Sequence, residues 1–181
     1  MNITNIKHHL RRTFSALAVV GALIMLPSAN GETRAIAGTR LTATGSWTDC
    51  EHVVSVTSYP SYDVVTLSIT STYTGTFSGT WEGVEEDVVY SDGYFTVHAE
   101  GIFTGSVAGT SGTVRLTYNA AVPPLPGGSP VDNPWYVDKG TGDLAGLRGQ
   151  GIWVHFQHPG PTPGCDDSFS SRYVGQISFG P

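Results

Sequence analysis

Apolar and polar side chains alternate along most of this chain from residue 40 onward. The longest alternating run covers residues 65–77, and its apolar face carries Val65, Leu67, Ile69, Tyr73 and Phe77. The opposite face carries only threonine and serine. A period of two is typical of a β-strand with one buried and one solvated face. No window after residue 38 keeps a helical period for more than two turns, so the pattern predicts an all-β fold.

Seven further segments alternate in the same way. They cover about residues 40–48, 80–91, 94–106, 112–121, 135–139, 148–157 and 168–179. Asp92-Gly93 is a two-residue hairpin signal, and the proline-rich stretches 123–130 and 158–164 are expected to be surface loops that join no strand ladder. Eight strands joined mostly by tight turns predict a closed eight-stranded antiparallel up-and-down barrel, which leaves no strand edge unpaired. The alternative is a two-sheet β-sandwich.

Residues 1–31 are typical of an export signal peptide. Basic residues precede an apolar run at 14–26, which as a helix would rise about 20 Å and fall short of the ~30 Å hydrocarbon core. Small residues suited to cleavage follow at 29–31 and again at 35–37. We therefore expect one barrel domain over residues 32–181, exported to the extracellular space or cell envelope, with no stable membrane span after processing. The adjacent Arg11 and Arg12 leave twin-arginine export open beside the general route.

Composition narrows the classes of partner. The formal net charge is −6, and three of the nine basic residues (Lys7, Arg11 and Arg12) lie in the expected leader. The mature chain then has six basic against fifteen acidic residues, a net charge of −9. Nucleic-acid binding needs a basic surface that neutralises phosphates, so this class of partner is excluded.

The chain has two cysteines, Cys50 and Cys165. In an oxidising compartment an even pair of this kind predicts a disulfide. The alternative, a reactive thiol pair, is disfavoured because acidic residues flank both cysteines and would oppose thiolate formation. A bridge closing 115 residues would join the end of the first strand to the start of the last, which are neighbours in a barrel.

Residues 140–151, with the sequence GTGDLAGLRGQG, resemble the C-terminal signature of a bacterial family of domains of unknown function. That family is grouped with the allene oxide cyclase-like barrel superfamily, and plant dirigent proteins carry a similar turn. Glycine-rich strand ends at 74–79 and 105–112 resemble the same family. The resemblance implies an eight-stranded barrel, in agreement with the strand count, and it carries no catalytic residue over to this chain.

The inward faces of the predicted strands are rich in aromatic side chains. They comprise Trp47, Tyr73, Phe77, Phe95, Phe103, Tyr118, Trp135, Phe156, Tyr173 and Phe179. An eight-stranded barrel is wide enough either to be filled by side chains or to hold one small ligand. Small residues on the same faces, including Gly45, Gly101 and Gly175, favour a partial cavity lined by these rings. A connected cavity of ~300 Å³ or more would favour ligand binding over a purely structural role.

The third strand places carboxylates in the interior whichever face turns inward. If Val84 and Val88 point inward, Glu82 and Glu86 accompany them, and the opposite face buries Glu85 and Asp87 with Trp81. Either the barrel contains acidic groups, or a bulge near Gly83 or a protruding strand end removes them. A buried carboxyl has a raised pKa and can act as a general acid or base. The candidate catalytic residues, one or two at most, are Glu82, Glu85, Glu86 and Asp87.

Other chemistry has little support in the sequence. His98 and Glu100 share a strand face that also carries Thr96, which favours a solvent-facing pair, and no spacing typical of metal ligands occurs. No nucleophile elbow, phosphate-binding loop or dinucleotide fingerprint is present. We therefore expect no metal and no cofactor.

Two functional hypotheses follow. The first is a secreted barrel that binds a small apolar or aromatic molecule and steers a cofactor-free, non-redox cyclisation or isomerisation. The second is a non-catalytic, disulfide-stabilised extracellular or envelope domain that acts through its surface. The first depends on analogy at the level of the fold, and the volume of the barrel interior distinguishes the two.

Overall fold

A computed structural model describes residues 38–124 and 133–180 of the chain, and eight strands account for most of them. Their bounds are β1 (Arg40–Ser58), β2 (Tyr62–Gly75), β3 (Phe77–Tyr90), β4 (Phe95–Val107), β5 (Thr110–Val122), β6 (Pro134–Gly142), β7 (Leu147–Gln157) and β8 (Ser170–Phe179). Within these residues there is no helix of the length and hydrophobicity needed to cross a membrane. The expected leader, its two cleavage sites and most of the 123–130 loop lie outside the described residues.

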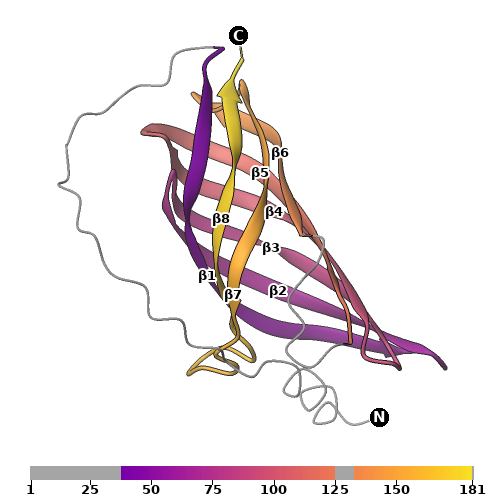
Figure 1. Ribbon diagram of the computed structural model, residues 1–181. Coiled ribbons are helices and arrows are strands. Elements are labelled where there is room, and N and C mark those ends of the chain that lie inside the picture. Colours follow the sequence, from indigo (N-terminus) through magenta and orange to yellow (C-terminus); the bar gives the residue numbers. More distant parts are fainter. Residues whose placement is uncertain (1–37, 125–132, 181) are drawn as a thin grey trace.

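The strands form a closed antiparallel barrel in chain order (Figure 1). Each strand pairs with its sequence neighbours, and β1 closes the ring by pairing with β8, where Arg40 lies opposite Ser178. The prediction of an up-and-down barrel is therefore confirmed, and the sandwich is not formed. In Figure 1 the strands are strongly tilted, and the hairpin joining β1 and β2 projects at the lower right.

Burial follows the alternation of the sequence. In β2 the side chains of Val65, Leu67, Ile69 and Tyr73 are each at most 6% exposed, while the threonines between them face outward. The apolar faces of the eight strands meet in one core inside the ring. Burial of the apolar face is therefore what closes the sheet.

One half of the barrel interior is filled by aromatic rings. Phe77 makes edge-to-face contacts with Phe103 and Tyr173 at centroid distances of 5.5 and 5.6 Å, a favourable geometry for ring quadrupoles. The inward-facing glycines make room for these rings: a Cβ at Gly45 would lie 2.3 Å from the Tyr173 hydroxyl, and one at Gly175 would lie 2.3 Å from Trp135. The interpretation that these glycines leave an empty cavity is therefore wrong, because rings occupy the space.

Two β-bulges shape the opposite half. In β1 the pairing with β2 shifts between Val53 and Ser55, which leaves Val54 outside the ladder and 64% exposed. In β7 the pairing with β8 shifts between Val154 and Gln157. His155, inside that shift, has a φ of 58°, an uncommon conformation for a residue with a side chain. Bulges re-aim the side chains that follow them, and this one turns Phe156 toward the interior.

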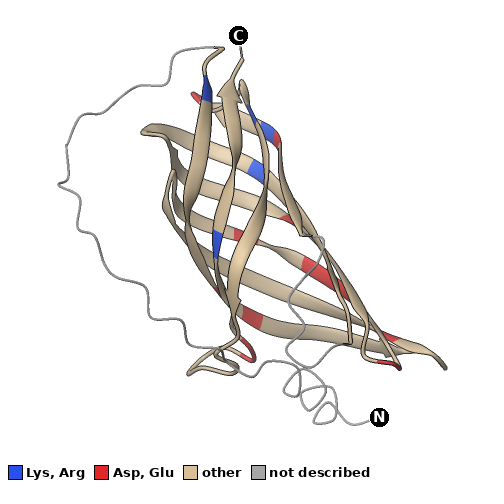
Figure 2. Ribbon diagram, viewed as in Figure 1, with Lys and Arg blue, Asp and Glu red and all other residues tan. Residues whose placement is uncertain are grey.

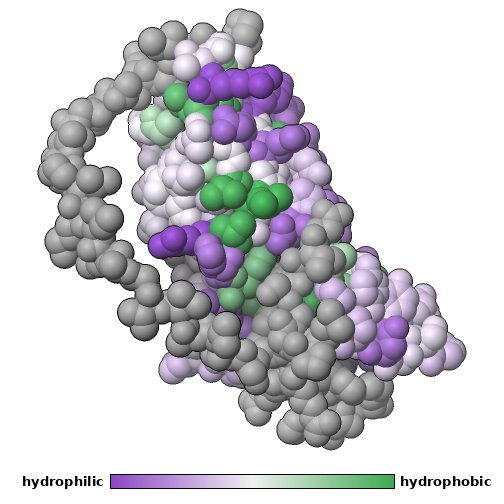
Figure 3. Space-filling model, in the orientation of Figure 1, coloured by the Kyte–Doolittle hydropathy of each residue, from purple (hydrophilic) through white to green (hydrophobic). Residues whose placement is uncertain are grey.

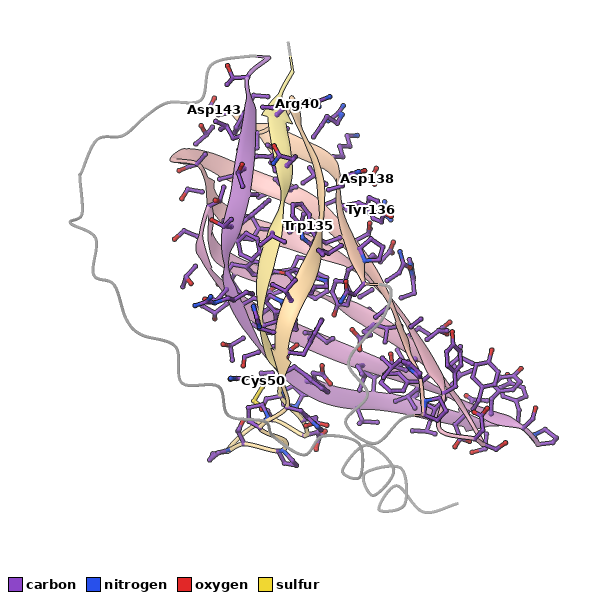
Figure 4. The ribbon with its side chains drawn as sticks, in the orientation of Figure 1. Arg40, Cys50, Trp135, Tyr136, Asp138 and Asp143 are labelled. Carbon is purple, nitrogen blue, oxygen red and sulfur yellow. A yellow bond between two sulfur atoms is a disulfide. The ribbon has the colours of Figure 1, made fainter. Side chains whose placement is uncertain are left out.

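Cys50 and Cys165 form a disulfide with a Cα–Cα distance of 5.2 Å (Figure 4). Cys50 lies in the middle of β1 and not after its end, because β1 continues to Ser58. Cys165 lies in the segment between β7 and β8, directly after the 158–164 stretch that was expected to join no strand ladder. Thr162 of that stretch forms an isolated bridge with Cys165, and belongs to none of the eight strands. Beyond the stretch, Glu51 and Asp167 form an isolated antiparallel bridge that attaches the segment to β1. The disulfide therefore fixes the β7–β8 segment across one end of the barrel.

Candidate functional site

A cavity of about 120 Å³ lies in the half of the barrel that the aromatic rings leave unfilled. Strands β1 to β5 and β7 line it, and the β7–β8 segment contributes the rest of its wall. The cavity is partly open to solvent. It is smaller than the ~300 Å³ proposed as a criterion for ligand binding, and it is close to the 150 Å³ of an apolar cavity that accepts benzene. Its size therefore suits a one-ring molecule.

The predicted aromatic lining divides between the two halves of the barrel. Trp47, Phe95, Tyr118 and Phe156 line the cavity. The others belong to the packed half: Tyr73, Phe77, Phe103, Trp135, Tyr173 and Phe179. Only a space of about 10 Å³ remains between the rings there, too small for an organic ligand. The aromatic side chains therefore form a packed core at one end of the barrel and line a cavity at the other.

Strand β3 turns Glu85 and Asp87 into the barrel, and each is only 6% exposed. Trp81, on the same face, is fully buried and fixes this orientation. Glu82 and Glu86 point outward and are exposed, so these two of the four candidate residues do not reach the cavity. The pairing of β3 with β2 and β4 is continuous, so the alternative of a bulge near Gly83 is wrong.

Strand β1 contributes two further buried carboxylates, Asp49 and Glu51, at 4% and 6% exposure. Both line the cavity together with Glu85 and Asp87. The Oδ1 atom of Asp49 accepts a hydrogen bond of 2.5 Å from the backbone N–H of Phe169. Figure 2 shows that acidic positions gather in the lower half of the barrel, while most of the basic ones lie higher. The cavity half of the barrel is therefore acidic as well as aromatic.

The β7–β8 segment adds a hydrogen-bonded histidine and aspartate to the rim. His158 Nε2 lies 2.8 Å from Asp167 Oδ1, and the His158 ring stacks on Phe169 at a centroid distance of 4.3 Å. The Oδ2 atom of Asp166 accepts a hydrogen bond of 3.1 Å from the backbone N–H of Val53. The first two contacts hold the segment together, and the hydrogen bond to Val53 attaches it to β1.

Glu85 is the centre of a short hydrogen-bonded chain. The hydroxyl of Tyr118 donates to Oε2 of Glu85, and Glu85 is also hydrogen-bonded to Asp87. Burial raises the pKa of Glu85 to about 7, although the hydrogen bonds from Tyr118 and Asp87 oppose the rise. Burial, followed by the charge of Glu85, raises the pKa of Asp87 well above its usual value. Burial therefore favours the protonated, neutral form of both carboxyl groups.

The same electrostatics extend to β1. Burial is the main cause of the raised pKa of both Asp49 and Glu51. The charge of Glu85 raises both pKa values further, while the N–H of Phe169 lowers that of Asp49. Within the described ranges, no lysine or arginine lines the cavity to balance these groups. Carboxylates in such surroundings retain protons or take up a cation.

Three buried polar atoms at the cavity residues have no hydrogen-bond partner within the described part of the protein. They are Oδ1 of Asp87 and the indole N–H groups of Trp47 and Trp153. A buried polar atom without a partner costs free energy. All three atoms belong to side chains that line the cavity, although each atom is itself enclosed.

No group of three His, Cys, Asp or Glu side chains in residues 38–124 and 133–180 has an arrangement that would hold a metal ion. His98, also considered from the sequence, lies on the outer surface, where its Nδ1 is 2.8 Å from Asn119 Oδ1. The side chains that line the cavity bring carboxyl, phenol and indole groups to it.

Sequence reasoning missed three residues of the site, Trp153, Asp49 and Glu51, for two reasons. Trp153 and Phe156 are three positions apart, so they lie on opposite faces of a regular strand. Because the sequence analysis placed Phe156 inside the barrel, it left Trp153 outside. The bulge at His155 turns both side chains inward. Asp49 and Glu51 were missed because the first strand was ended at residue 48. Their even spacing from the inward-facing Trp47 was the available signal.

These features define a class: a small closed antiparallel barrel, packed at one end and holding an acidic, aromatic cavity at the other. One similar solved structure is a protein of unknown function from the DUF3224 family of Shewanella oneidensis MR-1. The two are 17% identical, the match covers 79% of this chain and 99% of that chain, and the TM-score is 0.61. This likeness confirms the shared barrel fold that the resemblance at residues 140–151 implied.

A second similar structure is a pterocarpan synthase dirigent protein. It is 13% identical, the match covers 82% of this chain and 90% of that chain, and the TM-score is 0.46. No family model matches the sequence, and no curated protein matches it.

Proposed function

We propose that the protein is an exported barrel that binds a small apolar or aromatic molecule in its end cavity. The single observation that carries this proposal is the cavity itself, because interiors of folded proteins normally leave few voids larger than a water molecule. Its walls are mainly apolar with a few convergent polar groups, which is the usual composition of a small-molecule site. Indole and phenol groups at Trp47, Trp153 and Tyr118 would orient the ligand.

The finer proposal is that the Glu85–Asp87 pair supplies acid–base chemistry. A carboxyl that holds a proton near neutral pH can protonate a bound molecule, and its carboxylate neighbour can remove a proton elsewhere on that molecule. The two transfers leave the ligand isomerised or cyclised, with the pair returned to one shared proton. This cofactor-free, non-redox step needs no oxidant or reductant.

Export is proposed on two grounds. The basic and apolar pattern of residues 1–31 is typical of a signal peptide. The disulfide between Cys50 and Cys165 is compatible with an oxidising compartment outside the cytoplasm.

The binding proposal is tested by filling the cavity. Ala120, on β5, lines it, so A120W should abolish binding of benzyl alcohol, a neutral one-ring probe, as measured by calorimetry. Ala121 is the next residue on β5, does not line the cavity and points to the other face of the sheet, so A121W is the matched control and should bind like the unmodified protein. The proposal is overturned if A120W binds benzyl alcohol as well as the unmodified protein does, or if the unmodified protein binds neither benzyl alcohol nor any other one-ring probe.

One observation favours the second hypothesis, an interaction domain that acts through its surface. Ile152 and Val174, register partners on β7 and β8, are 48% and 37% exposed. Figure 3 shows a hydrophobic patch near the middle of the barrel, in the region where Figure 1 places β7 and β8. This surface function becomes the better explanation if the cavity proves unable to bind a ligand.

A further inference from the structure

We infer that the ligand of the end cavity is an organic cation, a small aromatic or alkyl ammonium compound whose charged group lies among the carboxylates of β1 and β3. This inference rests on the proposed ligand-binding function and specifies the chemical class of the ligand. The volume of the cavity cannot distinguish a cation from a neutral molecule of the same shape, whereas the charges around the cavity can.

The first ground is the imbalance of charge around the cavity. Four buried carboxyl groups, on Asp49, Glu51, Glu85 and Asp87, face one space of about 120 Å³. Within the described residues, no lysine or arginine is among its lining groups. His158 contacts Asp167 at the rim. A ligand that carries its own positive charge would supply the counter-charge that the protein does not.

The second ground is an unsatisfied acceptor. Asp87 is only 6% exposed, lines the cavity, and its Oδ1 atom accepts no hydrogen bond from the described residues. A buried carboxyl oxygen without a hydrogen-bond partner is costly. Once Asp87 loses its proton, a charge-assisted hydrogen bond from an ammonium group is among the strongest that can satisfy this oxygen. This oxygen atom therefore indicates a ligand that donates a hydrogen bond. The four acidic side chains taken together indicate only a preference for positive charge.

The third ground is the aromatic wall. Trp47 and Trp153 pack edge-to-face at 5.2 Å, and Tyr118 contacts Trp153 in the same geometry at 6.0 Å. All three line the cavity. The faces of indole and phenol rings attract cations, and the attraction grows when water is excluded. Aromatic rings beside carboxylates are the combination by which proteins hold ammonium groups.

Binding of a cation should be linked to release of protons. The titratable groups that face the cavity or its rim are Asp49 and Glu51 on β1, Glu85 and Asp87 on β3, Tyr118 on β5, and His158, Asp166 and Asp167 on the β7–β8 segment. Burial raises the pKa of Glu85 to about 7, so an ammonium ion competes with the proton there. Affinity for a cation should rise with pH through this range, whereas affinity for a neutral ligand should not.

The test uses three probes of nearly equal shape and different charge: benzylammonium, benzyl alcohol and benzoate. Calorimetry at pH 8 is expected to show benzylammonium binding about tenfold more tightly than benzyl alcohol, a difference of about 1.4 kcal/mol, with benzoate weakest. The preference for benzylammonium should shrink by roughly tenfold between pH 8 and pH 6, because the carboxyl groups take up protons.

Matched variants on one strand locate the charge. E85Q and D87N should each weaken the binding of benzylammonium until its affinity approaches that of benzyl alcohol. Retained binding of benzyl alcohol shows that the variants are folded. E86Q removes an adjacent carboxylate that faces outward and should leave the preference for the cation unchanged.

Each result separates the cation from its alternatives. Equal binding of benzylammonium and benzyl alcohol overturns the inference and leaves the proposed function standing. No binding of any probe overturns the proposed function and this inference with it. Displacement of benzylammonium by millimolar Ca²⁺ would identify the carboxylates as a metal site and overturn the assignment to an organic cation.

Discussion

At the scale of single residues, Glu85 is the most informative position in the molecule. It lies within the core strand β3, is nearly inaccessible to solvent, and is hydrogen-bonded to both Tyr118 and Asp87. Buried carboxyl groups oppose folding when ionised, because the charge loses its hydration. The protein keeps such a group where an apolar residue would be more stable, which is the pattern expected of a functional position.

The pKa of Glu85 makes stability dependent on pH. Since folding raises this pKa from 4.5 to about 7, the stabilising contribution is complete below pH 4.5 and is lost as the pH rises through 7. The loss amounts to about 3 kcal/mol. E85Q should therefore unfold with a flatter pH dependence and be more stable than the unmodified protein at pH 8, as measured by urea denaturation. E86Q serves as the control, and parallel pH profiles for E85Q and the unmodified protein would contradict the assignment.

At the scale of elements, the turn between β6 and β7 explains two of the glycines in residues 140–151. A Cβ at Gly140 would lie 1.9 Å from the carbonyl oxygen of Leu144. Gly142 has a φ of 60° with no atom within 4 Å of the place of a Cβ. The two glycines are therefore needed for different reasons, close approach of backbone at one and a left-handed conformation at the other.

Alanine substitutions should separate these two reasons. G142A should cost about 1 kcal/mol, the usual penalty of a left-handed alanine. G140A should cost at least about 2 kcal/mol more, because the turn must move to admit the methyl group. Urea denaturation of the pair, with unchanged circular dichroism as the check on folding, measures the difference. Equal losses of stability would show that the contact at Gly140 is relieved without cost.

The disulfide is the second element whose effect can be measured. It joins Cys50 on β1 to Cys165 in the segment that completes the cavity. Replacing both cysteines by serine should lower the melting temperature by roughly 10 °C, since a closed loop of about 115 residues contributes about 5 kcal/mol on the chain-entropy model. The barrel should persist, because every strand pairing remains.

The same variant should also bind benzyl alcohol more weakly than the unmodified protein at a temperature where both are folded. The reason is that the β7–β8 segment then depends on its backbone hydrogen bonds to Asp49 and Glu51 and on side-chain contacts. Unchanged affinity would show that these contacts are sufficient to hold the segment in place.

At the scale of the whole molecule, the sequence predicted the barrel because alternation is strong wherever strands are regular. Each of the eight segments corresponds to a strand. The prediction that the third strand places two carboxylates inside the barrel was correct because β3 has no bulge. The hydrophobic pattern failed where pairing is irregular, at the β7 bulge around His155. It also could not show that the β7–β8 segment folds back on β1, since that contact links positions more than 100 residues apart.

The expected leader leads to a prediction for the mature protein. When the full chain is expressed in a bacterial host, the exported form should begin near Glu32, because the small residues at 29–31 suit cleavage. Intact mass and N-terminal sequencing of the exported fraction provide the measurement. A product that begins at Met1 would contradict the prediction, and one beginning just after Ala37 would select the second cleavage site.

The division of the barrel into a packed end and a hollow end has a consequence for how the protein can change. Side chains such as Trp81 and Phe103 are wholly enclosed, so most replacements there would leave voids and threaten folding. Residues around the cavity, such as Val97 and Ala120, border empty space, and exchanging them alters the shape of the binding site at little cost in stability. The packed end therefore maintains the fold, while residues around the cavity can be substituted to bind new ligands, by natural variation or in the laboratory.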